Sequence, residues 1–170
     1  MGSSPIGATK YMNIDKQETL LTINTEAFWT WRKLKKYRKL QRPIVFPPNL
    51  TGMCALGSVA LFKRLKFDLK IDDIKFIVGS YKIPRDWYTY CHCWLRYKDY
   101  VIDITASQFD EIRNSIVIDK ESNAFYLEKF SNRRVYEDIA NIKDYFDEAG
   151  WVHSQNPFMS KRKGKLKFNA

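Results

Sequence analysis

The chain has 170 residues, of which 45% are hydrophobic and 15% aromatic, so it can bury the core of one domain and is not a disordered polymer. Its formal net charge of +10 predicts attraction to acidic surfaces. No run approaches the roughly 18 uninterrupted apolar residues of a membrane span, and no secretory signal peptide is visible at the N-terminus.

Three parts are expected along the chain. Residues 1–20 have no sustained apolar period, which predicts a flexible N-terminal arm. Residues 21–158 are expected to form a single domain, followed by a basic C-terminal tail at residues 159–170.

The first helix is predicted to begin at Asn24 or Thr25, either of which can cap it, and to end at Arg42-Pro43. Apolar residues recur within it at three- to four-residue spacing and predict a stripe that faces the core. These residues are Ala27, Phe28, Trp31, Leu34 and Tyr37.

Basic residues occupy the other faces of this helix. The ordinary interpretation is a solvated outer face, which needs no partner. The alternative is a binding surface in which Arg32, Lys35, Lys36 and Lys39 hold nucleic acid or an acidic protein. No zinc finger, Gly-rich phosphate loop or RNA-recognition signature accompanies these residues.

After an extended Pro-rich segment at residues 43–50, a second helix is predicted from Thr51 or Gly52 to about Lys66. It places Cys54 in the first turn, where unpaired backbone N–H groups point outward. A strand is expected from Ile74 to Tyr81.

A hairpin is predicted next, from two runs rich in aromatic and β-branched residues at 88–97 and 100–105, joined by Lys98-Asp99. If Tyr97 pairs with Tyr100, His92 and Asp103 become diagonal neighbours on one face of the sheet. A carboxylate at that position can accept the imidazole N–H and fix its tautomer. Cys91 and Cys93 then point to the opposite face.

Beyond the hairpin, the segments 112–118 and 124–130 are compatible with either strand or helix. A last amphipathic helix that ends at Gly150 is predicted from the spacing of four apolar residues. These residues are Val135, Ile139, Ile142 and Phe146.

Three of these residues suit thiol catalysis. A thiol becomes a good nucleophile as thiolate, and both an imidazolium neighbour and a helix N-terminus lower its pKa. Cys54 would be the nucleophile, His92 the general base and later the acid, and Asp103 the group that orients the imidazole. Taken alone, Cys54 would be a small buried core residue; its combination with His92 and Asp103 favours catalysis.

Supporting roles are predicted for three further residues. Asn49 in the Pro-rich segment, or Gln108 just beyond the hairpin, could donate a hydrogen bond to an oxyanion. Trp94 shares the strand face of His92 and could shield the imidazole or line a substrate groove.

The three cysteines do not suggest a disulfide framework or a metal site. Cys91 and Cys93 flank His92 on one strand, where neighbouring side chains diverge, so a reducing compartment such as the cytoplasm fits best. The same divergence argues against zinc, which needs convergent ligands at a recognisable spacing. We expect neither a metal nor a cofactor.

Two motifs resemble those of a known family. The run 51–61, with Gly52-Met53-Cys54 at its start, resembles the Gly-x-Cys helix start of transglutaminase-like cysteine enzymes. The run from His92 to Leu95, followed by residues 100–106 with Asp103-Ile104-Thr105, resembles their His-x-Trp and Asp-x-Thr strands. The chain is also similar to the small transglutaminase-like peptidases that cut leader peptides in lasso-peptide maturation.

The resemblance implies an α+β, papain-like core in which the helix with Cys54 packs on an antiparallel β-sheet. It also implies acyl transfer through a Cys54 thioester, on a peptide or side-chain amide bond, by a protease, amidase or deamidase. Hydrolysis is favoured over transamidation because water is the default acceptor. The alternative is a non-enzymatic module that binds nucleic acid or an acidic protein through the basic helix at residues 26–42.

Overall fold

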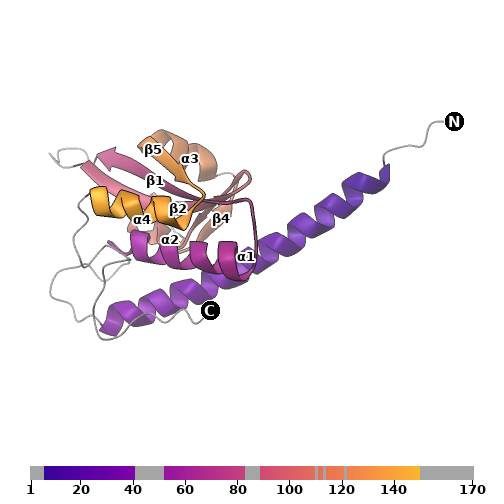
Figure 1. The fold of residues 1–170 in the computed structure, drawn as a ribbon, viewed down its shortest axis with the longest axis horizontal. Coiled ribbons are helices and arrows are strands. Elements are labelled where there is room, and N and C mark those ends of the chain that lie inside the picture. Colours follow the sequence, from indigo (N-terminus) through magenta and orange to yellow (C-terminus); the bar gives the residue numbers. More distant parts are fainter. Residues whose placement is uncertain are drawn as a thin grey trace.

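The computed structural model describes residues 6–40, 52–82, 89–109, 111–112, 114–120 and 122–149. Within them, four α-helices accompany an antiparallel sheet of five strands in the order β4-β3-β2-β1-β5 (Figure 1). The helices are α1 (Ile6–Leu40), α2 (Cys54–Lys63), α3 (Ser122–Lys129) and α4 (Ile139–Glu148). The strands are β1 (Ile74–Lys82), β2 (Thr89–Tyr97), β3 (Tyr100–Asp103), β4 (Val117–Asp119) and β5 (Ser131–Tyr136). The predicted α+β class is confirmed.

The sheet separates two hydrophobic clusters. Alternate residues of a strand project to opposite faces, so Cys93 and Leu95 of β2 join the core under α1, α2 and α4. On the other face, Trp94 joins a smaller aromatic cluster with Tyr126 of α3 and Phe130. Both faces of β2 are therefore covered, which explains its nearly continuous apolar and aromatic sequence.

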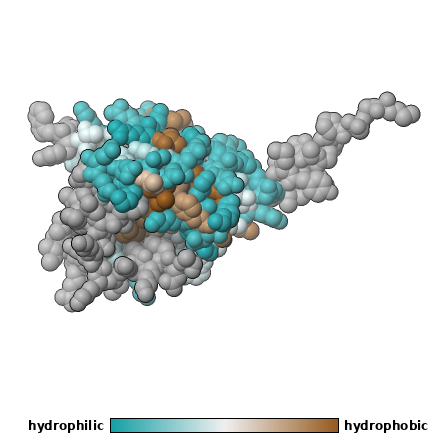
Figure 2. Space-filling model, viewed as in Figure 1, coloured by the Kyte–Doolittle hydropathy of each residue, from teal (hydrophilic) through white to brown (hydrophobic). Residues whose placement is uncertain are grey.

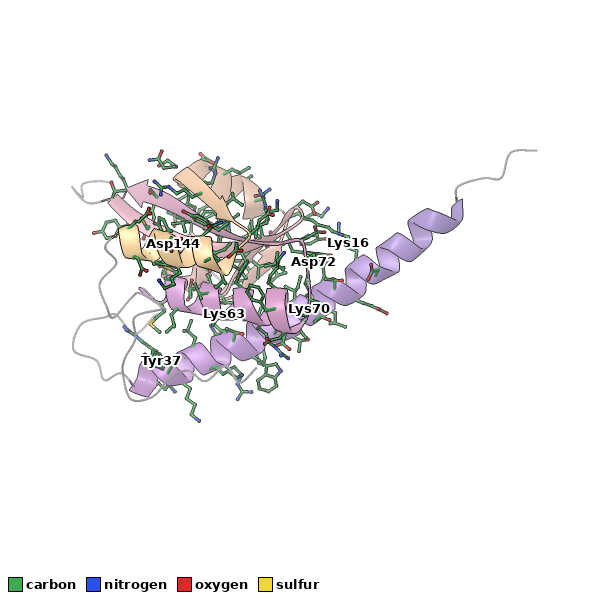
Figure 3. The ribbon with its side chains drawn as sticks, viewed as in Figure 1. Lys16, Tyr37, Lys63, Lys70, Asp72 and Asp144 are labelled. Carbon is green, nitrogen blue, oxygen red and sulfur yellow. The ribbon has the colours of Figure 1, made fainter. Side chains whose placement is uncertain are left out.

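Helix α1 differs from its prediction, because it begins at Ile6 and not at Asn24 or Thr25. Residues 6–20, expected in a flexible arm, are helical. Threonines that could cap a helix instead return hydrogen bonds to carbonyls four residues earlier, as Thr25 does to Leu21 at 2.9 Å. Lys16 lies where α1 leaves the body of the protein (Figure 3) and forms an ion pair with Asp99 at 3.7 Å.

The core-facing stripe of α1 is offset from the predicted one. Ile23, Ala27, Thr30 and Leu34 are buried, whereas Phe28 is 43% exposed. Ala27 and Leu34 are buried, and Trp31 and Tyr37 pack partly buried against the core, as predicted; Phe28 lies on the exposed side of the helix and was predicted wrongly. The face seen in Figure 2 is mainly hydrophilic, with small hydrophobic patches. None of the described helices has the length and apolar content to cross a bilayer.

Helix α2 and strand β1 follow the prediction closely. A π-helical turn at Arg64–Asp68 continues α2 beyond the predicted end at Lys66. The guanidinium of Arg64 ties this turn to α1 through two hydrogen bonds to Glu26, of 3.0 and 3.1 Å. Ser58 of α2 donates a 2.9 Å hydrogen bond to the carbonyl of Cys93, which fixes the helix against β2.

The C-terminal part contains one strand that the sequence did not indicate. Val135 lies in β5 and is 47% exposed, so it does not belong to the predicted helix. Helix α4 begins after Asp138, whose side chain caps it by accepting a 2.6 Å hydrogen bond from the N–H of Ala140. Ile142 and Phe146 face the core as predicted. The two ambiguous segments supply β4 and α3.

Two glycines mark close approaches and make a matched pair for mutagenesis. A Cβ on Gly79 would lie 2.7 Å from Phe130 Cβ and 2.8 Å from Trp94 Cη2, two side-chain atoms that cannot move aside like the end of a flexible chain. We expect Gly79→Ala to lower the unfolding free energy by about 1–3 kcal/mol through overpacking. A Cβ on Gly57 would meet the movable ends of Leu34 and Ile104, at 2.9 and 3.2 Å.

Gly57→Ala also gains about 1 kcal/mol of helix propensity, so its net effect on stability should be near zero. Urea unfolding of the two variants checks the contrast. Equal losses in both would contradict the packing described for the aromatic cluster.

Candidate active site

Asp103, the last residue of β3, is a fully buried and fully hydrogen-bonded carboxylate. One oxygen accepts bonds from the backbone N–H and the hydroxyl of Thr105, at 2.7 and 2.9 Å. The other accepts from His92 Nε2 and from the Tyr126 hydroxyl, each at 2.6 Å. Burial raises the pKa of Asp103, but the charge and hydrogen bond of His92 and the other donors outweigh it and hold that pKa below its usual value.

His92 lies on β2 opposite Gly79 and is buried by aromatic rings. Trp94 and Phe130 stack on the imidazole at centroid distances of 5.8 and 5.4 Å, and Phe109 meets it edge-on at 4.8 Å. Burial lowers the pKa of His92, whereas the charge and hydrogen bond of Asp103, with a smaller contribution from Cys54, raise it to about 9. The predicted Tyr97–Tyr100 pairing and the His92–Asp103 contact are both confirmed.

Gln108 lies in a short 3-10 turn (Ala106–Gln108), next to the second ring nitrogen of His92, Nδ1. Its amide nitrogen is 2.8 Å from His92 Nδ1 and 3.1 Å from the Thr105 carbonyl. Because Nε2 faces Asp103, this contact fits a neutral imidazole that accepts at Nδ1. In the imidazolium, the Nδ1 proton needs an acceptor, which a Cys54 thiolate can supply.

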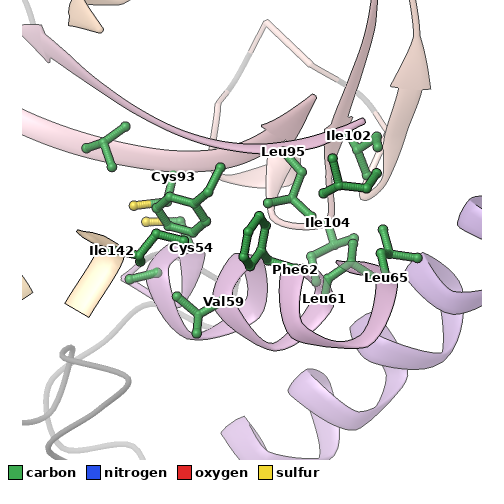
Figure 4. Close-up of a cluster of buried hydrophobic side chains, with 14 of the residues drawn as sticks. Cys54, Val59, Leu61, Phe62, Leu65, Cys93, Leu95, Ile102, Ile104 and Ile142 are labelled. Carbon is green, nitrogen blue, oxygen red and sulfur yellow. The ribbon is translucent and has the colours of Figure 1, made fainter. Parts of the chain in front are cut away.

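Cys54 is the first residue of α2, after Met53, and is 3% exposed. Figure 4 shows its sulfur beside that of Cys93, between α2 and the sheet. The pKa of the Cys54 thiol is held well below its usual value of 9.0. A hydrogen bond with the Cys93 side chain lowers it most, burial raises it, and the hydrogen bond and charge of His92 lower it further.

Two consecutive residues of β2, His92 and Cys93, thus both lower the pKa of the Cys54 thiol. The faces of Cys93 and His92 are opposite, as predicted, but the contact between Cys93 and Cys54 was not foreseen. Strand alternation together with the packing of the Cys54 helix on the sheet would have indicated it. Tyr126 and Thr105, the further donors to Asp103, were also missed as site residues. Thr105 stands two residues from Asp103, but Tyr126 comes from α3, which the sequence did not assign.

Two predicted site residues stand differently. Trp94 is only 2% exposed, so it shields His92 and lines no groove, because α3 and Phe130 cover its face of the sheet. Asn49 lies outside the described residues.

A cavity of about 680 Å³ opens beside β1 and the C-terminal end of α4. Val78 and Ser80 line it, and they pair across the sheet with Cys93 and Cys91. The cavity therefore lies on the Cys54 face of the sheet, one strand away from Cys93. Arg134 and Glu148 also line it. In the part of the chain that the structure describes, no three His, Cys, Asp or Glu side chains are grouped to hold a metal ion.

Comparison of the chain with models of protein families, with curated proteins and with solved structures gave no match.

Proposed function

We propose that the protein is a cysteine hydrolase of transglutaminase-like, papain-like architecture that cleaves a peptide or side-chain amide bond through a Cys54 thioester. The observation that carries the proposal is the 2.6 Å contact of His92 with a buried, fully hydrogen-bonded Asp103. Opposite pKa shifts of Cys54 and His92 support it, since they favour a thiolate and an imidazolium at neutral pH. This is the charge state that a thiol nucleophile requires.

The chemistry follows from the roles of the three groups. Cys54 Sγ attacks the amide carbonyl, and the imidazolium of His92 gives its Nδ1 proton to the departing amine, which leaves a thioester. The neutral imidazole then takes a proton from water, whose oxygen attacks the thioester and releases the acid and the Cys54 thiolate. Asp103 keeps Nε2 protonated and the ring oriented throughout. Backbone N–H groups in the first turn of α2 and the Gln108 amide are the proposed oxyanion donors.

Access to the sulfur is part of the proposal. At 3% exposure, Cys54 Sγ meets a substrate only after local opening, which costs far less than global unfolding near loops and helix ends. The cavity beside β1 and α4, on the same face of the sheet, is the proposed space for the substrate. Burial should slow the encounter without changing which residue reacts.

An activated ester tests the proposal without knowledge of the substrate. With p-nitrophenyl acetate, we expect a burst of p-nitrophenol and one acetyl group on the peptide that contains Cys54, detected by mass spectrometry. His92→Ala should slow acetylation by at least about 100-fold, as expected for loss of a general base. Cys91→Ser is the matched control and should leave the burst unchanged. Acetylation of lysines alone, equal in Cys54→Ala, would overturn the proposal.

A second candidate function is binding of nucleic acid or an acidic protein through α1. It is favoured by the exposure of Trp29, 48%, and of Phe28, with the guanidinium of Arg32 over both rings at 5.3 and 5.8 Å. Lys35, Lys36 and Lys39 are also exposed on this helix. Such binding to single-stranded nucleic acid should weaken steeply with salt, and it should survive Cys54→Ser.

A further inference from the structure

The side chains of Cys54 and Cys93 form a buried dithiol. Their sulfurs lie side by side (Figure 4), and each thiol is a hydrogen-bond partner of the other. They belong to different elements, α2 and β2, and both are in one hydrophobic cluster. The 2.9 Å bond from Ser58 to the Cys93 carbonyl, one helical turn after Cys54, keeps the two elements in register.

We propose that this pair is an oxidation site at which a small peroxide converts the two thiols into a Cys54–Cys93 disulfide. The nucleophilic role of Cys54 rests on the proposed function, whereas formation of the disulfide depends only on the dithiol. A disulfide needs Cβ atoms about 3.5–4.5 Å apart and a sulfur–sulfur bond of about 2 Å. The two sulfurs already lie side by side between α2 and the sheet (Figure 4), so the proposed bond joins groups that face one another.

The third cysteine is placed differently. Cys91 lies two residues before Cys93 on the same strand face, with its sulfur 3.9 Å from the Ser80 hydroxyl on β1. Cys91 is partly exposed, whereas Cys93 is fully buried. If solvent exposure decided which cysteine forms a disulfide with Cys54, the partner would be Cys91. If contact with the Cys54 sulfur decides it, the partner is Cys93. The two expectations can be separated by experiment.

The proposed reaction has two balanced steps. The Cys54 thiolate attacks hydrogen peroxide, the O–O bond breaks, and sulfenic acid and hydroxide are formed; sulfur is oxidised and peroxide reduced. Cys93 sulfur, losing its proton, then attacks the sulfenic sulfur, and the S–O bond breaks with release of water. Because peroxide is small, it needs less local opening than a peptide substrate to reach the nearly buried sulfur.

Formation of the disulfide would reversibly inactivate the proposed active site. In the disulfide, the Cys54 sulfur is bonded to Cys93 and is no longer a thiolate, so it cannot form a thioester, and Cys93 protects it from irreversible oxidation to sulfinic acid. A thiol reductant cleaves the disulfide and restores the thiols of Cys54 and Cys93. The buried pair would thus make catalysis depend on the redox state of the compartment.

Peptide mapping after peroxide treatment tests this inference. Wild type and Cys91→Ser should both yield a cross-link between the Cys54 and Cys93 peptides that dithiothreitol reverses. Cys93→Ser keeps a hydroxyl donor beside Cys54 but should yield no cross-link and accumulate Cys54 sulfinic acid. Circular dichroism confirms that each variant is folded.

A cross-link from Cys54 to Cys91, or over-oxidised or unreacted Cys54 in the folded wild type, would overturn the inference. The acetylation experiment gives an independent outcome. A protein that forms the disulfide but no acyl-enzyme would refute the hydrolase and keep the oxidation site. A protein that forms the acyl-enzyme but no disulfide would refute the oxidation site and keep the hydrolase.

Discussion

Replacing Asp103 with asparagine should lower the unfolding free energy by about 3–5 kcal/mol, the range for breaking a buried ion pair by removing one partner. The amide is nearly the same size, so the loss is electrostatic. Four donors now converge on the carboxylate, two on each oxygen, so an asparagine NH₂ group in either position would face two of them. The variant should also lower the pKa of His92, because the charge of Asp103 is the main force that raises it.

Urea unfolding at neutral pH measures this effect. Asp99→Asn is a matched control in the hairpin turn, where the carboxylate is half-exposed and pairs with Lys120; it should change stability little. Tyr126→Phe should lie between the two, with a loss of about 1.5–3 kcal/mol for one hydrogen bond to a charged group. An Asp103→Asn variant as stable as wild type would mean that the pair with His92 is not ionised.

The dependence of stability on pH should reveal the thiol–imidazole pair when Cys54 is replaced. Between about pH 6.5 and 9, an unfolded chain holds one proton on the cysteine and none on the histidine. The folded pair also holds one, as imidazolium beside thiolate. Because proton binding is equal in the two states, the pair contributes no slope in this window.

Cys54→Ala removes the thiol, so that only the proton bound by His92 can differ between the folded and unfolded states. His92 alone then has a folded pKa above its unfolded value of 6.5, so its stabilising contribution is full below pH 6.5 and is lost as pH rises toward the folded pKa. The loss is at most about 3.5 kcal/mol, from the shift of the His92 pKa from 6.5 to about 9 at roughly 1.4 kcal/mol per pH unit. Because the Cys54 thiolate also raises the pKa of His92, its loss makes the folded pKa of His92 somewhat lower than in wild type.

Unfolding free energies measured from pH 6 to 9 in a reducing buffer test this expectation. Between pH 6.5 and 9, wild type should keep a flat profile while Cys54→Ala loses stability as pH rises. His92→Ala combined with Cys54→Ala should restore the flat profile. Parallel curves for wild type and the single variant would show that the two groups do not exchange a proton.

Much of the site was predictable because its parts are local. Strand alternation and a two-residue turn are enough to bring His92 next to Asp103, and both conditions are visible in residues 88–105. The position of Cys54 at the start of α2 follows from the apolar run after it. These inferences need only neighbouring residues and known geometry.

The parts that escaped prediction depend on long-range packing. Tyr126 reaches Asp103 across the face of the sheet from α3, whose residues alone are compatible with strand or helix. The start of α1 at Ile6 depends on helix-forming residues without an apolar period, so periodicity does not indicate it. Val135 had the right spacing for a helix but pairs with Ile77 in the sheet.

The rate at which iodoacetamide alkylates Cys54, followed by peptide mapping from pH 4 to 10, tests the central claim most directly. The account predicts a rate that rises to a plateau well below pH 9 in wild type, because the thiolate is already formed there. In His92→Ala the rise should move toward higher pH, and in Cys91→Ser it should stay in place. A wild-type rate that keeps rising through pH 9, or one that His92→Ala leaves unmoved, would contradict a thiolate stabilised by His92.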